Sequence, residues 1–136
     1  MASLRVSLSL SSSDVLSSPL NLTVSTTALA DSGSLIRAKV KGTAADTDDL
    51  ILYLASSMLE RAYLYVKNLD PDLENYIYVR NETESNTAIC AKIGGGEFAF
   101  IPLAVDKTYE AIATKANTLI EYGVFGLDNS AVTFAS

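Results

Sequence analysis

The chain has 136 residues, of which 49% are hydrophobic and 19% charged, and its formal net charge is −6. This length suits one domain with a sizeable core, and an acidic chain with only ten Lys and Arg residues argues against nucleic-acid binding. The lack of histidine and the single cysteine exclude Ser-His-Asp and Cys-His catalysis, zinc sites and internal disulfides, and we expect no cofactor.

The N-terminal residues, MASLRVSLSLSSSD, contain no positively charged segment followed by a continuous apolar one, so we expect no signal peptide. No run approaches the roughly 18 apolar residues that a membrane helix requires. We therefore expect a soluble protein without a membrane partner, and a chain free of disulfides fits assembly in a reducing cytoplasm.

The dominant sequence period in the first third of the chain is two, which is typical of half-buried β-strands. Leu4, Val6 and Leu8 alternate with polar residues and predict an N-terminal strand or arm within residues 1–12. The same alternation recurs in two further segments, residues 20–25 and 36–41. Serine-rich or glycine-containing breaks separate these predicted strands.

Residues 50–60 fit either a helix or a strand. Asp46, Asp48 and Asp49 precede this segment and could begin a helix, because acidic residues favour a helix N-terminus. The run Ile51-Leu52-Tyr53-Leu54 suits a strand equally well, and its neighbours are predicted strands. We favour a short strand followed by a helical turn near Ser57–Glu60.

Two alternating segments, residues 61–68 and 75–81, flank a proline-containing turn and predict a β-hairpin. Pairing them would create one aliphatic face. The opposite face would carry four tyrosines and two cations: Tyr63, Tyr65, Lys67, Tyr76, Tyr78 and Arg80. That face is either a second packed layer or a contact surface.

Gly94, Gly95 and Gly96 lie between two apolar segments, residues 88–93 and 97–103. They do not form a phosphate-binding loop, because strand-like alternation follows them instead of a Lys-Ser/Thr pair and a helix. Glycine allows the positive φ that tight turns require. We predict a hairpin turn that bends the first segment back onto the second, and we expect Cys90 to be a small buried hydrophobic residue.

Two acidic clusters could hold a hard cation. Asp70, Asp72 and Glu74 are spaced as at the start of a calcium loop, but the glycine and glutamate that complete such a loop are missing. The cluster of Asp46, Asp48 and Asp49 is equally incomplete, and solvated turns are the simpler interpretation of both. No acidic residue lies in a recognisable glycosidase motif, so we predict a non-enzymatic protein.

Further alternating segments at residues 109–113 and 118–125 extend the series of short strands to the C-terminal region. Short strands at this spacing predict an all-β fold, an antiparallel β-sandwich of about eight or nine strands with jelly-roll-like wiring. Residues 127–136 are expected to form a loose tail, or to dock on a neighbouring molecule.

Several strand sequences resemble small β-sandwich virion proteins of tailed phages, especially phages of marine bacteria and cyanobacteria. The resemblance lies in four segments: Leu64-Tyr65-Val66-Lys67-Asn68, Tyr76-Ile77-Tyr78-Val79, Gly96-Glu97-Phe98-Ala99-Phe100-Ile101-Pro102 and Leu119-Ile120-Glu121-Tyr122-Gly123-Val124-Phe125. In the phage proteins, strands of the type LYIKN, GEFAFFP and LEYMVF recur in this order. The phage proteins often have a FPWDG turn, whereas Leu103 follows Pro102 here, so a partner surface at this turn would differ.

The resemblance implies a capsid decoration, or cement, protein that binds the outer surface of the major capsid protein in the virion. It also implies a homo-oligomer, with a trimer favoured. The alternatives are a tail or fibre component and a carbohydrate-binding module for the host surface. The expected contact regions are the N-terminal segment, the tyrosine-bearing residues and the C-terminal tail.

Overall fold

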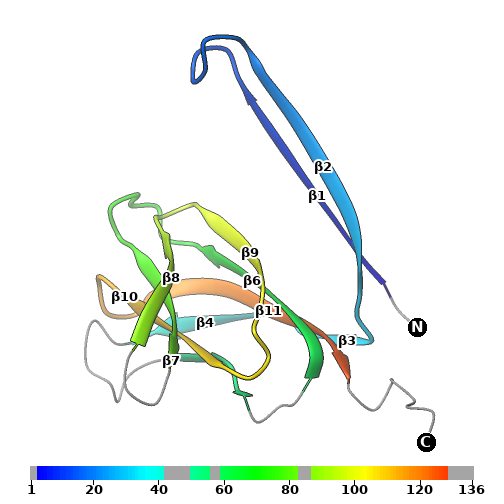
Figure 1. The fold of residues 1–136 in the computed structure, drawn as a ribbon. Coiled ribbons are helices and arrows are strands. Elements are labelled where there is room, and N and C mark those ends of the chain that lie inside the picture. Colours follow the sequence, from blue (N-terminus) through cyan, green and yellow to red (C-terminus); the bar gives the residue numbers. More distant parts are fainter. Residues whose placement is uncertain (1–2, 42–49, 56–58, 83–86, 129–136) are drawn as a thin grey trace, which may run out of the picture.

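The computed structural model describes residues 3–41, 50–55, 59–82 and 87–128. Over these residues the chain forms eleven strands, and the strand pairs are antiparallel. The strands divide into a protruding arm and two sheets, named here sheet I and sheet II (Figure 1).

The strand bounds follow the alternating segments of the sequence closely. The arm consists of β1 (Ser3–Ser12) and β2 (Leu20–Leu29). Sheet I contains β3 (Ser32–Gly33), β4 (Ile36–Val40), β6 (Leu59–Asn68), β9 (Phe98–Pro102) and β11 (Thr118–Asp128). Sheet II contains β5 (Leu50–Tyr53), β7 (Ile77–Glu82), β8 (Thr87–Ile93) and β10 (Thr108–Ala113).

The wiring of the two sheets is that of a jelly roll. The strands pair in nested order, with β4 on β11, β5 on β10, β6 on β9 and β7 on β8. Pairs β4–β11 and β6–β9 belong to sheet I, whereas the other two belong to sheet II. A long antiparallel ribbon rolled into two facing sheets gives this arrangement. The predicted all-β sandwich with jelly-roll-like wiring is therefore confirmed.

The core lies between the two sheets and is built from the inward half of each alternating strand. Leu64 and Val66 from sheet I face Ile77 and Val79 from sheet II, and none of these four side chains exposes any surface. Burying one such aliphatic side chain contributes roughly 1.5–3 kcal/mol. The period-two pattern thus fixes which side chains enter the core.

The predicted hairpin between residues 61–68 and 75–81 is wrong. β6 pairs with β9 and β11 in sheet I, while β7 pairs with β8 and β10 in sheet II. The two aliphatic faces meet across the core, so the two sets of tyrosines point to opposite outer faces of the sandwich. The four tyrosines therefore do not share a face.

The glycine segment forms a turn, but the turn connects the two sheets and does not close a hairpin. β8 before it belongs to sheet II and β9 after it to sheet I. The Glu97 amide donates to the carbonyl of Gly94 (2.9 Å), and Gly96 has a φ of 83°. A Cβ on Gly95 would collide with the backbone carbonyl of Asp72, so the turn packs tightly on the neighbouring loop.

Three smaller expectations also change. Leu59 and Glu60 begin β6 and are not helical, and Ser57 lies outside the described residues. β11 includes Leu127, which is buried, and Asp128, so the predicted tail is wrong for these two residues, and residues 129–136 lie outside the described residues. Cys90 is exposed and not buried as expected, and it lies at an irregularity of β8, where the register with β7 shifts between Ile89 and Ala91. The predicted strand at Leu50–Tyr53 is confirmed.

Candidate functional site: an apolar groove beneath the arm

The arm is a two-stranded hairpin that leaves the sandwich at β3 and extends beyond it (Figure 1). Its register places Leu8 opposite Val24 and Leu10 opposite Leu22. Residues directly opposite each other in an antiparallel pair lie on the same face. One face of the arm therefore carries an apolar stripe: Leu4, Val6, Leu8, Leu10, Leu22 and Val24.

The base of the arm is attached to sheet I. The amide of Asp31 donates to the carbonyl of Gly126 (2.9 Å), and Ala28 and Ala30 are buried. Near this base, Leu4 and Val6 are half-buried. Burial of the apolar stripe decreases along the arm away from the base. The exposed fractions of Leu8, Leu10, Leu22 and Val24 are 40%, 42%, 41% and 50%.

The outer face of sheet I, beneath the arm, carries aromatic side chains from three adjacent strands. Tyr65 lies opposite Phe100, and Tyr63 lies opposite Phe125. The rings of Tyr63 and Phe100 are stacked, with centroids 5.8 Å apart. We call this set the aromatic band: Tyr63, Tyr65, Phe98, Phe100 and Phe125. Phe98, on edge strand β9, is 59% exposed.

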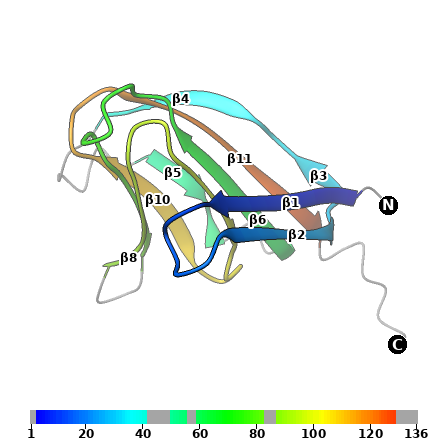
Figure 2. The ribbon, with the colours of Figure 1, turned by 90° about the horizontal axis from the view of Figure 1, so that it is seen from above.

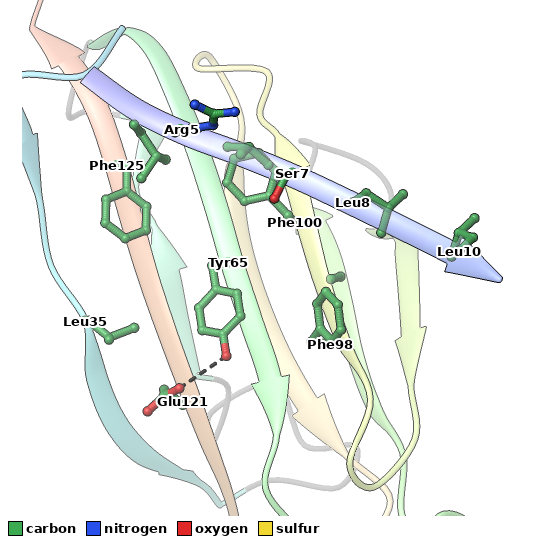
Figure 3. Close-up of a pocket in the computed structure, with 13 residues that line it drawn as sticks. Arg5, Ser7, Leu8, Leu10, Leu35, Tyr65, Phe98, Phe100, Glu121 and Phe125 are labelled. Carbon is green, nitrogen blue, oxygen red and sulfur yellow. Dashed lines mark hydrogen bonds between the residues drawn. The ribbon is translucent and has the colours of Figure 1, made fainter. Parts of the chain in front are cut away.

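A groove of about 920 Å³ separates the arm from the aromatic band. Its two walls are β1 above and strands β6, β9 and β11 below, and β1 crosses over these strands (Figures 2 and 3). Leu8 and Leu10 line it on the side of the arm, and Phe98 and Phe100 line it on the side of the sheet. Both walls are therefore largely apolar, although Arg5, Ser7 and Glu121 also line the groove, and such a surface suits contact with another protein.

A short polar network borders the groove. The hydroxyl of Tyr65 donates to Glu121 (3.2 Å), and Glu121 also pairs with Arg37 (3.3 Å; Figure 3 shows the tyrosine contact). Burial, and then the contact with Glu121, raises the pKa of Tyr65 above its ordinary value of 10.0. Tyr65 therefore stays neutral at physiological pH and holds Glu121 beside the groove.

The other predicted contact residues lie elsewhere. Lys67 shares the outer face of sheet I with the aromatic band, opposite Phe98. Tyr76 and Tyr78 lie close together on sheet II, with ring centroids 6.3 Å apart. The ammonium group of Lys92 lies 4.1 Å from the centre of the Tyr76 ring.

The sequence predicted that Arg80 would be an exposed cation on a contact surface, and this prediction is wrong. Arg80 is buried and forms an ion pair with Glu110, with Nε and Oε1 2.7 Å apart. A buried ion pair of this kind has a structural role, because removing one partner leaves a buried charge uncompensated.

The acidic turn does not assemble a cation site. Asp70 accepts a hydrogen bond from the amide of Asp72 (2.8 Å), and Asp72 accepts one from the amide of Glu74 (3.0 Å). Asp72 also pairs with Lys115 (3.0 Å), which lowers the pKa of its carboxyl group. Within the described part of the chain no group of three potential metal ligands comes together. Asp46, Asp48 and Asp49 lie outside the described residues.

The sequence predicted some of the residues that line the groove and missed others. Leu4, Val6, Leu8 and Tyr65 were among the expected contact residues, whereas Phe98, Phe100 and Phe125 were not. The alternation of Phe98 and Phe100 around Ala99 was the available signal. The sequence does not show which side of this strand a second layer covers, so the alternation alone could not assign the two rings to an outer face.

In the described residues no helix is long and apolar enough to cross a membrane. The chain matches no protein-family model, no curated protein and no solved structure in the comparisons made. The resemblance to phage virion proteins therefore stays a prediction, and the groove is the feature from which a function is inferred.

Proposed function

We propose that the protein is a non-enzymatic structural component of a phage virion and that it decorates the outer surface of the capsid shell. The observation that carries this proposal is the open, largely apolar groove, with exposed aliphatic side chains on the arm, and with the exposed ring of Phe98 beside half-buried aromatic rings on the sheet. Such surfaces are typical of protein–protein contacts. The strand resemblance supplies the choice of the major capsid protein as partner.

The jelly-roll architecture supports the proposal at the level of fold. Jelly rolls are common in viral capsid proteins and in lectin domains. Fold does not determine function, however, so this support is an analogy.

The repetition of binding sites on a capsid shell suits a cement role for a protein of this kind. A shell repeats the same site many times, and contacts that are individually modest become strong when they are repeated and linked. Binding to the assembled shell alone would stabilise that shell by mass action. The acidic chain, with its net charge of −6, would also remain soluble while many copies accumulate before assembly.

The test is co-sedimentation of the purified protein with expanded empty capsids of the phage that encodes it. We expect saturable binding at hundreds of copies per shell, and shells stripped of the protein should lose heat resistance until it is added back. Failure to bind expanded capsids, or unchanged heat resistance of stripped shells, would contradict the proposal.

A second candidate function is carbohydrate recognition by a tail or fibre component. The observation in its favour is the pair of Tyr76 and Tyr78 with Lys92 on the outer face of sheet II. Binding to a glycan array that is lost in Tyr78→Ala, with only a few copies per virion, would support this candidate and reject the cement role.

A further inference from the structure

We propose that a second copy of this chain closes the groove, with the distal half of each arm packing on the aromatic band of the other copy. The contact surface on the arm is formed by Leu8, Leu10, Leu22 and Val24. The contact surface on the sheet is formed by Phe98, Phe100 and Tyr65.

The arm is incomplete in one molecule. Among the residues that the structure describes, its two strands pair only with each other, apart from the attachment at its base. An isolated two-stranded hairpin is at best marginally stable in water, and it needs a further layer against its apolar face. The distal half of the stripe lacks such a layer, since its four side chains are 40–50% exposed.

The arm's own sheet does not supply this layer. Ala28, Ala30 and the hydrogen bond between Asp31 and Gly126 hold the base of the arm on sheet I. From this fixed base the arm diverges from the band, and the groove of about 920 Å³ is the result. The arm of another copy is not held by this attachment and can approach the band directly.

The chain already uses this contact. At the base, Leu4 and Val6 line the same groove as Phe125 and are half-buried there. The proposed contact extends this pairing of an aliphatic stripe with aromatic rings along the rest of the band. The new interface is therefore continuous with a contact inside the molecule.

The charge distribution also favours a second copy of the chain as the occupant of the groove. Residues 3–29 contain one basic residue, Arg5, and one acidic residue, Asp14, so the arm is neutral while the whole chain carries −6. Two acidic molecules that meet through neutral arms avoid placing like charges in contact. Nucleic acid and anionic membranes are disfavoured as occupants, because the acidic chain repels them.

The contact between two copies can be reciprocal. Each copy offers one stripe and one band, so two copies related by a twofold axis satisfy both surfaces at once. Head-to-tail exchange around a ring would satisfy them as well. Exchange of an identical element between copies is a low-cost route to such assemblies.

This inference rests on the proposed function in one respect, because a shell component works beside many copies of itself. Its test uses the isolated full-length chain. Failure of self-association and failure of capsid binding can therefore be told apart.

The first experiment measures self-association by sedimentation velocity over a concentration series. Phe98→Ser should raise the dissociation constant about tenfold or more. The matched control is Ile89→Ser, because Ile89 is 61% exposed and Phe98 59% exposed, and Ile89 lies on the edge strand of the opposite sheet. On the arm, Leu8→Asp should weaken association and Ser9→Asp should not, since Ser9 occupies the polar face of the same strand, opposite Thr23, and does not line the groove.

The second experiment identifies the surfaces in contact, on a Cys90→Ser background. Two differently tagged variants, Leu10→Cys and Phe98→Cys, are mixed and oxidised, and a disulfide joining the two tags is expected. Ser9→Cys, on the polar face of β1, should give little of this product with Phe98→Cys. Urea unfolding of each variant checks that the sandwich remains intact.

A chain that stays monomeric at every concentration would overturn the proposal. Equal weakening by Leu8→Asp and Ser9→Asp, or by Phe98→Ser and Ile89→Ser, would do the same. A cross-link between two Leu10→Cys copies without the Leu10–Phe98 product would overturn the assignment of the aromatic band.

Discussion

The arm and the sandwich are built from strands with the same sequence pattern, yet they differ in what covers them. β1 and β6 both have ten residues that alternate. In β6 the inward Leu64 is fully buried, because sheet II lies against it. In β1 the equivalent Leu8 is 40% exposed, because no second layer reaches it. Alternation thus specifies a two-faced strand, and burial depends on a partner layer.

The two regions therefore differ in how much they contribute to the folding free energy. The sandwich completes its core within one chain and supplies most of the folding free energy. The arm contributes little to that core and leaves the distal half of its apolar stripe partly exposed. We expect the two regions to differ in how much a substitution changes the free energy of unfolding.

The largest effect is expected from truncating the same residue type in each region. Leu64→Ala should lower the free energy of unfolding by about 2–5 kcal/mol, because it leaves a cavity in the core. Leu8→Ala should change it by about 0.5 kcal/mol or less, as is usual for surface positions. Urea denaturation at a concentration where the chain is monomeric measures both values.

A loss of several kcal/mol in Leu8→Ala would contradict the comparison. It would mean that the arm belongs to the cooperative unit of the sandwich. Equal changes in the denaturant slope of both variants would point to the same conclusion.

An intermediate effect is expected at the turn between the sheets. Gly95→Val should cost about 1–3 kcal/mol, because its side chain would collide with the carbonyls of Asp70 and Asp72. Gly96 has open space around its Cβ position and a φ of 83°, so Gly96→Ala should cost about 1–2 kcal/mol from backbone strain alone. Thermal unfolding of the two variants tests the order.

If Gly95→Val unfolded at the same temperature as the unmodified chain, the turn could not be tightly packed. The turn between β8 and β9 would then tolerate a substitution as well as the arm does. Gly96→Asn is a useful addition, since asparagine tolerates a positive φ better than alanine.

The smallest effect is expected at alkaline pH. Burial raises the pKa of Tyr53 and of Tyr122 above 10.0. The folded state therefore favours the neutral phenols, so their stabilisation is complete below pH 10 and is lost as the pH rises through the higher folded values. We expect the melting temperature to fall by a few degrees above about pH 10.

The alkaline loss should belong to the sandwich, because residues 3–29 contain no tyrosine. Tyr122→Phe should reduce the decline, whereas Leu8→Ala should leave it unchanged. A decline that is identical in all three chains would show that another group is responsible.

Sequence patterns located the strands well but not their partners. The segments 20–25, 61–68 and 109–113 were each found within a few residues of an observed strand. Pairing was misjudged for β6 and β7, since neighbouring strands in sequence usually pair and a jelly roll pairs distant ones instead. The interactions that decide between these options lie between side chains far apart in the chain.

The candidate site was predictable only in part for the same reason. The alternation at Leu4, Val6 and Leu8 revealed an apolar face, but it could not reveal that this face would lie outside the sandwich. Phe98 and Phe100 alternate with Ala99, and the sequence does not show that Ala99, on the other side of β9, is the residue that packs against the core. Exposure is a property of the assembled layers.

The position of β11 in sheet I also constrains when the protein can fold. β11 pairs with β3, β4 and β6, and it is the last of the described strands to be synthesised. Sheet I therefore cannot be completed while the ribosome is still making the chain up to Thr118. The arm, in contrast, pairs strands that are adjacent in sequence, and such local pairing forms quickly. The two strands of the arm can thus pair before β11 is made, whereas the hydrogen bond between Asp31 and Gly126 that attaches the base of the arm to sheet I has to wait for β11.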